Sequence, residues 1–454
     1  MTSPPLLTVI LAAGKGTRMK SSMPKVLHEI AGLSMLGHTV KAATAAGDAT
    51  LAVVIGPGMD AVRAEATRLV PEAQIFIQEQ QLGTAHAVLA ARAAIAAHDG
   101  DVLVLFADTP LLQTSTLLRL LTCLDSQTPL AVLGFHAVDP AGYGRLVTDP
   151  SGALVAVREH KDASEAERKI TLCCSGVMAF HAGRMLPILE RIANHNAQSE
   201  YYLTDAVALA RSSGSKAAAI VCPEDEVLGI NSREQLAAAE AIYQARARRR
   251  AMAEGATLIA PETVWLSHDT VIGQDVTIEP NVFFGPGVTI EDGVQIRAHC
   301  HIEGARIRRG ARVGPFARLR PGADIGVDAH VGNFVEVKNV TLGTGAKANH
   351  LAYLGDGRVG NGANIGAGTI FCNYDGFNKY STDVGPGAFV GSNSALVAPV
   401  RIGAGAYIGS GSVITDDVPA DALALERSSQ QVREGWAAKF RSIMAARKPS
   451  RRER

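Results

Sequence analysis

The chain has 454 residues, and its 44 Lys and Arg residues are balanced by 44 Asp and Glu. A chain of this length is too long for one hydrophobic core, so two or three domains are expected. The charge balance excludes a general attraction to nucleic acid or to anionic lipid, which favours small-molecule partners.

The cysteines are scattered along the chain, and no two of them form a Cys-x-x-Cys pair. This pattern favours reduced thiols and argues against a zinc site. The sequence also holds no signal peptide and no membrane-spanning run, so we expect a cytoplasmic protein without membrane insertion.

A glycine-rich turn near the start of the chain has the composition of a phosphate site. The apolar run 6–11 predicts a buried parallel strand, and the turn that follows carries two glycines and two cations before an expected helix. Glycines let backbone N–H groups approach an anion, and a helix start adds partial positive charge. The residues of this turn, with one later cation, are Gly14, Lys15, Gly16, Arg18 and Lys25.

Two other glycine loops fit this turn less well. A Walker A loop needs four residues between its first glycine and Gly-Lys-Ser/Thr, whereas only Lys15 separates Gly14 from Gly16. A dinucleotide fingerprint needs a third glycine where Met19 stands, and an acidic residue about 20 positions further on that closes a second strand. This chain has neither feature. An ordinary strand-to-helix turn without a ligand is the remaining alternative.

Residues 1 to about 230 alternate apolar runs with helical stretches, which predicts βαβ units and a mainly parallel sheet. The run 102–106 ends at Ala107 and Asp108. Because ligands bind at the carboxyl ends of parallel strands, we expect Asp108 and the Gly14 turn to share one crevice.

Residues 232–252 contain no glycine or proline and are rich in alanine and charge, which predicts one long helix acting as a spacer. Its run Arg248–Arg250 could be a nucleic-acid patch. Because Glu240 and Glu254 flank the run and the chain has no net charge, a solvated helix face is the better interpretation.

Beyond Gly255 the apolar pattern has a period of six. Aliphatic or aromatic residues recur at Ile272, Ile278, Phe284, Ile290 and Ile296, and the pattern continues to Val337. After an interruption it resumes from Val384 to Ile414. One inward aliphatic residue and one tight turn every six positions predict a parallel β-helix. Collagen-like or low-complexity sequence is excluded because the glycine period is not three and β-branched residues are plentiful.

The segment 371–383 interrupts this period with polar and aromatic residues, which predicts a functional loop. The flat faces of a β-helix favour association of copies, and three-faced prisms often form trimers. The segment from Val432 onward, with Trp436 and Phe440, predicts a helix, and the basic run 447–452 predicts a frayed tail.

Two separate motifs resemble known families. The segment 11–19 followed by Pro24-Lys25 resembles the sugar-1-phosphate nucleotidyltransferases, and 349–356 within a six-residue repeat resembles the hexapeptide acyltransferases. Both motifs on one chain, in this order, are similar to the bacterial family that unites N-acetylglucosamine-1-phosphate uridyltransferase and glucosamine-1-phosphate N-acetyltransferase. The resemblance runs from Thr8 to Trp436.

The fold implied by this resemblance is an α/β nucleotidyltransferase domain with a Rossmann-like mixed sheet, then a left-handed parallel β-helix. The domains would be 1–231 for uridyl transfer, 232–253 for a linker helix and 254–454 for acetyl transfer with a helical tail. The implied assembly is a homotrimer. The implied product, UDP-N-acetylglucosamine, feeds peptidoglycan and lipopolysaccharide precursors.

For the first domain the resemblance implies uridyl transfer from UTP with Mg²⁺ held by Asp108 and Asn231. Such a reaction needs positioning and charge neutralisation, because a phosphate nucleophile is already ionised. Lys25 and Arg18 would be the catalytic cations. The implied UTP and sugar-nucleotide contacts are Leu11, Ala12, Ala13, Gly14, Lys15, Lys25, Gln78, Gly83, Thr84, Phe106, Ala107, Asp108, Gly144, Glu159, Cys174 and Asn231.

For the second domain the resemblance implies acetyl transfer from acetyl-CoA, which requires a base because the sugar amine must lose a proton. We assign this role to His350, which heads a polar break in the aliphatic pattern. Implied contacts to glucosamine-1-phosphate are Arg320, Lys338, Tyr353 and Asn364. Implied contacts to acetyl-CoA are Ala367, Asn373, Tyr374, Ser392, Ser410 and Arg427. Several of these lie too far apart around the coil for one chain, which predicts a site between subunits.

Two residues depart from the family pattern. Ala107 replaces a glycine before the metal aspartate, and Cys174 replaces an asparagine in an Asn-x-Gly segment. A thiol cannot donate the amide hydrogen bond that asparagine would give to a sugar hydroxyl.

Two rival functions remain open from the sequence. The chain could be a single-activity nucleotidyltransferase with a structural β-helix, in which case His350→Ala would change no activity. It could also be a nonenzymatic scaffold, in which case the crevice at Lys25 and Asp108 would not react with UTP.

Overall fold

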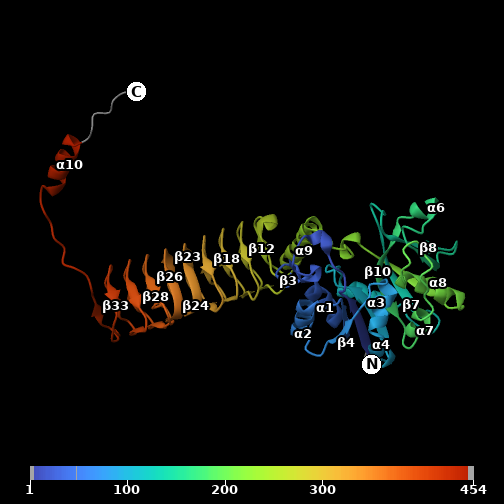
Figure 1. Cartoon of the computed structure of the whole chain (residues 1–454). Coiled ribbons are helices and arrows are strands. Elements are labelled where there is room, and N and C mark those ends of the chain that lie inside the picture. The colour runs from blue at the N-terminus through green and yellow to red at the C-terminus, as the bar shows by residue number, and fades with distance from the viewer. Residues whose placement is uncertain (1–4, 48, 448–454) are drawn as a thin grey trace, which may run out of the picture. The chain divides into compact units, whose positions relative to one another are not determined.

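The computed structural model describes residues 5–47 and 49–447, and the chain divides into two compact units. The first unit comprises the described residues up to Ala253 together with Trp265–Thr270, and the second comprises Glu254–Val264 and the described residues from Val271 onward. Figure 1 shows a sheet covered by helices in the first unit and a stack of short strands in the second. Most of the basic run expected as a frayed tail, residues 448–452, lies outside the described residues.

A nine-stranded mixed sheet forms the centre of the first unit. Its strands are β1 (Leu6–Leu11), β4 (Ala49–Ile55), β5 (Gln74–Ile77), β6 (Asp101–Phe106), β7 (Leu130–His136), β8 (Gly144–Thr148), β9 (Leu154–Arg158), β10 (Leu172–Phe180) and β11 (Ala217–Cys222). The main order is β11-β7-β10-β6-β1-β4-β5, and β8 and β9 extend from β10. Strands β6, β1, β4 and β5 are parallel, whereas β10 is antiparallel to both neighbours. The mixed α/β sheet expected from the sequence is therefore confirmed.

Helices cover both faces of this sheet (Figure 1). They are α1 (Met35–Ala45), α2 (Asp60–Leu69), α3 (Thr84–Ala90), α4 (Arg92–Ala96), α5 (Thr114–Leu121), α6 (Glu165–Arg168), α7 (Met185–Leu189), α8 (Ala206–Ser212) and α9 (Arg233–Ala253). Alternate residues of β1 enter different cores because a strand presents successive side chains to opposite faces. Leu7 and Val9 pack with α3, α4, α7 and α8, whereas Leu6 and Ile10 pack with α1, α2 and α5.

The glycine-rich turn does not open an α-helix, and the sequence prediction was wrong on this point. After β1 the chain forms only two short 3-10 turns, η1 (Thr17–Met19) and η2 (Lys25–Leu27), followed by the hairpin β2 (Glu29–Ile30) and β3 (Leu33–Ser34). A three-residue turn aligns too few peptide dipoles to act as a helix N-terminus. Any anion held here must be held by individual backbone N–H groups and by cationic side chains.

The predicted long helix is confirmed as α9, and it packs against the first unit rather than standing free. Gln244 is buried and its Nε2 donates to the carbonyl of Leu266 at 2.7 Å. Arg246 donates to the carbonyl of Leu111 at 2.7 Å, and Glu240 accepts from the N–H of Ala31 at 2.8 Å. Among the described helices, none has both the length and the apolar composition that crossing a bilayer requires.

The second unit is a parallel β-helix, as the six-residue period predicts. One sheet contains β12 (Thr257–Leu258), β14 (Thr277–Ile278), β17 (Gln295–Ile296), β20 (Arg312–Val313), β23 (His330–Asn333), β25 (Lys347–His350), β27 (Asn364–Ile365), β30 (Phe389–Val390), β33 (Tyr407–Ile408) and β35 (Leu423–Ala424). The other contains β13 (Val271–Ile272), β15 (Phe283–Phe284), β16 (Thr289–Ile290), β18 (His301–Ile302), β19 (Ala305–Ile307), β21 (Arg318–Leu319), β22 (Ala323–Ile325), β24 (Glu336–Leu342), β26 (Tyr353–Val359), β28 (Ile370–Cys372), β29 (Thr382–Val384), β31 (Ala395–Val397), β32 (Val400–Ile402) and β34 (Val413–Ile414).

The predicted inward residues fill the interior of this coil. Ile278, Ile290, Ile296 and Val331 are each at most 1% exposed, which buries one aliphatic side chain per short strand. The interruption predicted at 371–383 is a loop in which Tyr374 pairs with Lys379. The expected C-terminal helix is α10 (Trp436–Ala446), and none of its residues is buried.

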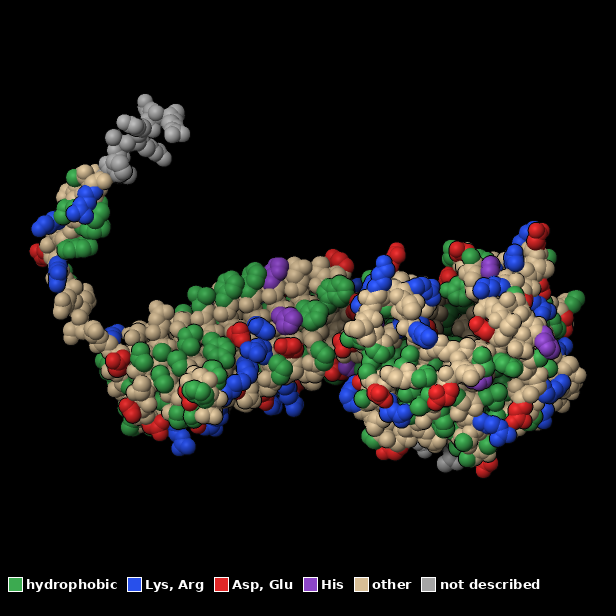
Figure 2. All heavy atoms as spheres, in the orientation of Figure 1, with side chains coloured by type: hydrophobic (Ala, Val, Ile, Leu, Met, Phe, Trp, Pro, Cys, Tyr) green, Lys and Arg blue, Asp and Glu red, His purple; other side chains and the backbone are tan. Residues whose placement is uncertain are grey.

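Corners of the β-helix hold non-glycine residues in the left-handed backbone conformation. At one corner the φ angles of His299, Phe316, Phe334 and Leu351 are 61°, 56°, 55° and 50°. The rings of His299 and Phe316 stack at 4.7 Å, and those of Phe316 and Phe334 stack at 5.2 Å. Phe316, Phe334 and Leu351 are 46%, 55% and 59% exposed, and Figure 2 shows hydrophobic side chains along the β-helix surface. We call these four residues the apolar corner.

Candidate active sites

A crevice of about 270 Å³ opens at the carboxyl ends of β1 and β6 in the first unit. Its lining contains Leu11, Ala12, Ala13, Gly14, Lys25, Gln78, Gly83, Thr84, Phe106 and Asp108. These residues come from four separate stretches of the chain, so the fold brings together most of the set that the sequence assigned to the nucleotide. Gln81 lines it too, and its Nε2 donates to the carbonyl of Ala13 at 2.6 Å.

Lys25 is the buried cation of this crevice. It is 8% exposed, and its Nζ donates to Asp108 Oδ2 at 2.5 Å and to Asn231 Oδ1 at 2.9 Å. Gly16 makes room for it, because a Cβ at that position would lie 2.5 Å from the Cβ of Lys25. Gly16 also has a φ of 60°, which L side chains adopt with strain. The glycine-rich turn therefore leaves the space that the Lys25 side chain occupies.

The donor set at Asp108 and Asn231 fits a hard divalent cation. A carboxylate oxygen and an amide oxygen converge on one point, where the ammonium of Lys25 now sits. Mg²⁺ is typically held by one or two such protein oxygens, and its other ligands are water and substrate phosphate. Among the described residues no group of three His, Cys, Asp or Glu could hold a metal, so these two oxygens would need substrate oxygens to complete the shell.

Seven assigned residues do not line the crevice: Lys15, Arg18, Ala107, Gly144, Glu159, Cys174 and Asn231. Lys15 and Arg18 are exposed on the turn after β1. Ala107 is fully buried, and its N–H donates to the carbonyl of Leu11 at 3.0 Å. Its methyl group therefore points into protein and leaves the crevice wall unchanged.

The residues assigned to the sugar form a neighbouring group on β8 and β10. Gly144 pairs with Cys174 across these strands, and a Cβ on Gly144 would lie 3.3 Å from a carboxylate oxygen of Glu159. Burial raises the pKa of Glu159, which accepts a hydrogen bond from Thr204 Oγ1 at 2.8 Å. Burial also raises the pKa of Cys174 to about 12, so its thiol stays neutral.

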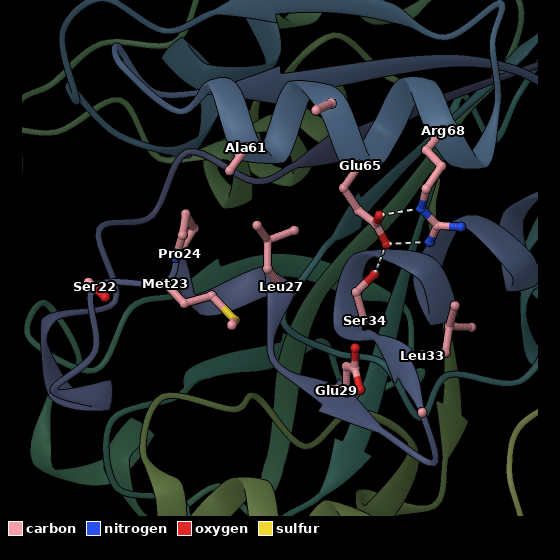
Figure 3. Close-up of a pocket in the computed structure, with 12 residues that line it drawn as sticks. Ser22, Met23, Pro24, Leu27, Glu29, Leu33, Ser34, Ala61, Glu65 and Arg68 are labelled. Carbon is pink, nitrogen blue, oxygen red and sulfur yellow. Dashed lines mark hydrogen bonds and ion pairs between the residues drawn. The ribbon is translucent and has the colours of Figure 1, made fainter. Parts of the chain in front are cut away.

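A larger cavity of about 810 Å³ lies between η2 and α2, and Figure 3 shows its lining. Pro24 and Leu27, which flank Lys25, contribute to its wall. On its polar side, the Glu65 carboxylate accepts hydrogen bonds from Arg68 and from Ser34 Oγ. No residue assigned to the nucleotide or sugar lines it, so it is separate from the candidate site.

In the β-helix, Lys338, Tyr353 and Asn373 lie together around Gly355 and Asp356. A Cβ on Gly355 would lie 2.4 Å from the Tyr353 hydroxyl and 2.8 Å from the Asn373 amide nitrogen. Lys338 Nζ contacts both oxygens of Asp356, at 3.2 and 3.1 Å. Arg320 lies on the same sheet, one coil earlier, and donates to Glu336 Oε1 at 2.9 Å.

His350 ends β25 and is exposed, with Nδ1 2.7 Å from Asn333 Oδ1 on the neighbouring coil. An oxygen partner at Nδ1 selects the tautomer with the proton on that nitrogen, so Nε2 keeps a free lone pair. Asn364 follows in the same sheet, on β27. Lys338 and Tyr353 belong to the other sheet, on β24 and β26, and Arg320 directly follows β21 of that sheet.

The residues assigned to acetyl-CoA form a column along the coil. The carbonyl of Ala367 accepts from the N–H of Asn393, and that of Ser392 accepts from the N–H of Gly411. Arg427 Nη1 donates to the carbonyl of Ser410 at 2.9 Å. Tyr374 is 59% exposed at the start of the inserted loop. The column and this loop offer an extended surface suited to a long ligand.

Five polar residues of these sites were missed in the sequence: Gln81, Glu200, Asn333, Asp356 and Lys379. Asp356 accepts hydrogen bonds from three side chains, and Asn333 orients His350. Lys379 lies so close to Lys338 that the pKa of Lys379 is lowered. Two of them carried a signal in the sequence: Asp356 ends the motif 349–356, and Lys379 lies in the interruption 371–383.

Comparison with known proteins agrees with the division into two kinds of domain. A model of the MobA-like NTP transferase domain matches residues 8–258, and one of bacterial transferase hexapeptide repeats matches 269–304 and 381–416. The Bifunctional protein GlmU of Bradyrhizobium sp. (strain ORS 278) is 60% identical over 442 residues, 97% of this chain and 98% of its own. The protein of that name from Azorhizobium caulinodans has the same identity and coverage, and that from Nitrobacter hamburgensis is 57% identical over 450 residues, 99% of each chain.

The fold and the two sites define a two-domain transferase, with a nucleotidyltransferase unit followed by a left-handed hexapeptide β-helix. The chain belongs to the family of the bifunctional protein GlmU. The family resemblance and the fold class expected from the sequence are thereby confirmed. An NTP transferase of this family is an enzyme that acts on small-molecule substrates with a divalent metal ion.

Proposed function

We propose that the chain makes UDP-N-acetylglucosamine in two steps. Acetyl-CoA first acetylates the amine of glucosamine-1-phosphate in the β-helix, and UTP then transfers uridyl to N-acetylglucosamine-1-phosphate in the first unit. The activities would divide into residues 1–231 and 254–454, with 232–253 between them. The observation that carries the proposal is that one chain holds both Lys25 between Asp108 and Asn231, and His350 oriented by Asn333.

In uridyl transfer the sugar phosphate oxygen attacks the α-phosphorus of UTP, and the bond to pyrophosphate breaks. The attacking phosphate is already ionised, so the protein must neutralise charge and align the reactants. Lys25 is already desolvated, and Arg18 and Lys15 are exposed beside it for the triphosphate. Mg²⁺, held by Asp108 and Asn231, would supply further charge neutralisation at the phosphates.

In acetyl transfer the sugar amine attacks the thioester carbonyl, and the C–S bond breaks to release coenzyme A. The amine must lose its proton, which the free lone pair of His350 Nε2 would accept and then pass to the departing sulfur. Lys338, Arg320 and Tyr353 would hold the sugar phosphate. Asn373, Tyr374 and the column from Ala367 to Arg427 would hold coenzyme A.

We infer that the acetyl transfer site is completed in a homotrimer. Asn364 and His350 lie on one sheet of the β-helix, whereas Lys338 and Tyr353 lie on the other. The apolar corner supplies a surface for association, because exposed aromatic residues gain from being buried. A neighbouring copy packed there would lie next to His350, since Leu351 belongs to the corner.

We also propose that the enzyme works in the cytoplasm. UTP and acetyl-CoA are made and kept there, so both co-substrates would be at hand. The cysteines that the structure describes are all free thiols, which persist in a reducing compartment.

The direct test is product analysis with the full chain, glucosamine-1-phosphate, acetyl-CoA, UTP and Mg²⁺. The complete mixture should yield UDP-N-acetylglucosamine and pyrophosphate. Omitting acetyl-CoA should stop both steps, and omitting UTP should leave N-acetylglucosamine-1-phosphate. A chain that used only N-acetylglucosamine-1-phosphate and UTP would instead be a single-activity nucleotidyltransferase.

A further inference from the structure

One carboxylate joins three coils of the β-helix. Lys338 and Asn339 lie on β24, Asp356 lies on β26 in the next coil, and Asn373 follows β28 in the coil after that. Lys338 Nζ reaches both oxygens of Asp356, Asn339 Nδ2 donates to Oδ1 at 2.9 Å, and Asn373 Nδ2 donates to Oδ2 at 2.6 Å. The middle coil therefore fixes side chains on both of its neighbours.

Two of the side chains that bond to Asp356 are largely buried, and both carboxylate oxygens accept hydrogen bonds. The side chains of Lys338 and Asp356 are 19% and 14% exposed, and Asn373 is 7% exposed. Burial opposes ionisation of Asp356, but the three hydrogen bonds together lower its pKa and keep it a carboxylate. Charged hydrogen bonds away from water hold side chains more firmly than exposed ones.

The backbone at Asp356 lies in the left-handed region. Its φ is 51°, and Asn339 at the same corner has a φ of 50°. Aspartate and asparagine adopt this conformation more readily than other non-glycine residues, and Asp275, Asp328 and Asp421 adopt it as well. Glycine is the residue best suited to it, so glycine can replace Asp356 without straining the backbone.

We propose that Asp356 is a positioning residue that couples the two substrate sites of acetyl transfer by holding Lys338 and Asn373 with one carboxylate. This inference rests on the proposed function, which gives Lys338 to the sugar phosphate and Asn373 to acetyl-CoA. In this role Asp356 would act through Lys338 and Asn373 and not by touching a substrate. Its loss would free both side chains at once, so both substrates would bind more weakly while His350 stays in place.

The test compares Asp356→Gly, Asp356→Asn and Asp328→Gly in the full chain. Glycine fits the left-handed corner, so Asp356→Gly removes the carboxylate without straining the backbone. Asp356→Asn keeps the shape and loses the charge. Asp328 has a φ of 54° and lies on another corner, so Asp328→Gly is the matched control for a change of aspartate to glycine.

Asp356→Gly should raise the KM for glucosamine-1-phosphate and for acetyl-CoA by about tenfold or more each, with kcat within about threefold. Asp356→Asn should show the same pattern to a smaller extent, and Asp328→Gly should leave both KM values unchanged. Uridyl transfer by the same preparations should match the wild type, and thermal unfolding would confirm that the β-helix is intact.

Two results would overturn the proposal. If Asp356→Gly keeps both KM values within twofold of the wild type, the aspartate is only a corner residue. If Asp356→Gly raises the KM for only one of glucosamine-1-phosphate and acetyl-CoA, Asp356 does not couple the two substrate sites. A wild-type chain that acetylates no glucosamine-1-phosphate would refute the proposed function itself, and this inference with it, before any variant is compared.

Discussion

At the scale of single residues, Gly16 and Lys25 depend on each other. A Cβ on Gly16 would lie 2.5 Å from the Lys25 Cβ, so Gly16→Ala should displace the lysine from Asp108 and Asn231. We expect uridyl transfer to fall at least about tenfold, since a displaced cation no longer faces the phosphates. Steady-state release of pyrophosphate measures this loss.

Gly183→Ala is the matched control for that substitution. Gly183 has a φ of 67°, and no atom lies within 4 Å of the position its Cβ would take. The change should cost about 1 kcal/mol of stability through backbone strain and leave uridyl transfer intact. Equal losses of activity in both variants would show that strain alone explains Gly16→Ala.

Glu159 should make stability depend on pH. Burial raises its pKa in the folded state, so the native protein binds this proton more tightly than the unfolded chain does. Stability should therefore fall as the pH rises from the ordinary carboxyl range through the raised pKa, and Glu159→Gln should remove that fall. Urea unfolding should show the variant to be more stable than the wild type at pH 8, and the difference should shrink toward pH 5.

The exposed Glu165 provides the comparison, since Glu165→Gln makes the same chemical change at a carboxylate outside the buried site. A gain in Glu159→Gln that is the same at pH 5 and pH 8, or a loss at pH 8, would contradict the account. Sequence alone could place Glu159 near the sugar by resemblance. It could not show the burial that shifts its pKa, because burial comes from contacts with distant residues such as Thr204.

At the scale of elements, Gly355 on β26 is the point where a residue assigned to the sugar phosphate meets one assigned to coenzyme A. A Cβ there would lie 2.4 Å from the Tyr353 hydroxyl and 2.8 Å from the Asn373 amide. Gly355→Ala should therefore reduce acetyl transfer at least about tenfold by moving both side chains, while uridyl transfer stays at the wild-type rate. Coupled assays of both products check this prediction, and an unchanged rate of acetyl transfer would contradict it.

The elements differ in how far their sequence predicts them. The β-helix follows from its six-residue period, because each short strand must bury one aliphatic residue such as Ile278 or Ile296. The expected helix after the Gly14 turn does not form, because a turn of glycines and cations has no apolar face to pack, and the chain instead makes the short turn η1. Asp356 and Asn373, which form a hydrogen bond, are 17 positions apart in the sequence. Such a contact depends on how successive coils stack, and the six-residue period does not determine that.

At the scale of the whole molecule, the apolar corner predicts self-association. Phe316 and Phe334 adopt the left-handed conformation at a cost of about 1–2 kcal/mol each, and both are exposed in one chain. Replacing both with asparagine, which tolerates this conformation, should convert the proposed trimer to smaller species without lowering the thermal stability of the β-helix. Light scattering after size-exclusion chromatography measures the mass, and a variant that stays trimeric would show that the interface lies elsewhere.

In the proposed function two independent active sites share this chain, and paired assays of Lys25→Ala and His350→Ala in the full chain separate them. Lys25→Ala should lower uridyl transfer by about 10²–10³-fold and leave acetyl transfer within twofold of the wild type. His350→Ala should lower acetyl transfer by about 10²–10⁴-fold and leave uridyl transfer intact. If either substitution removed both activities, or if His350→Ala changed neither, the account of two separate sites would be wrong.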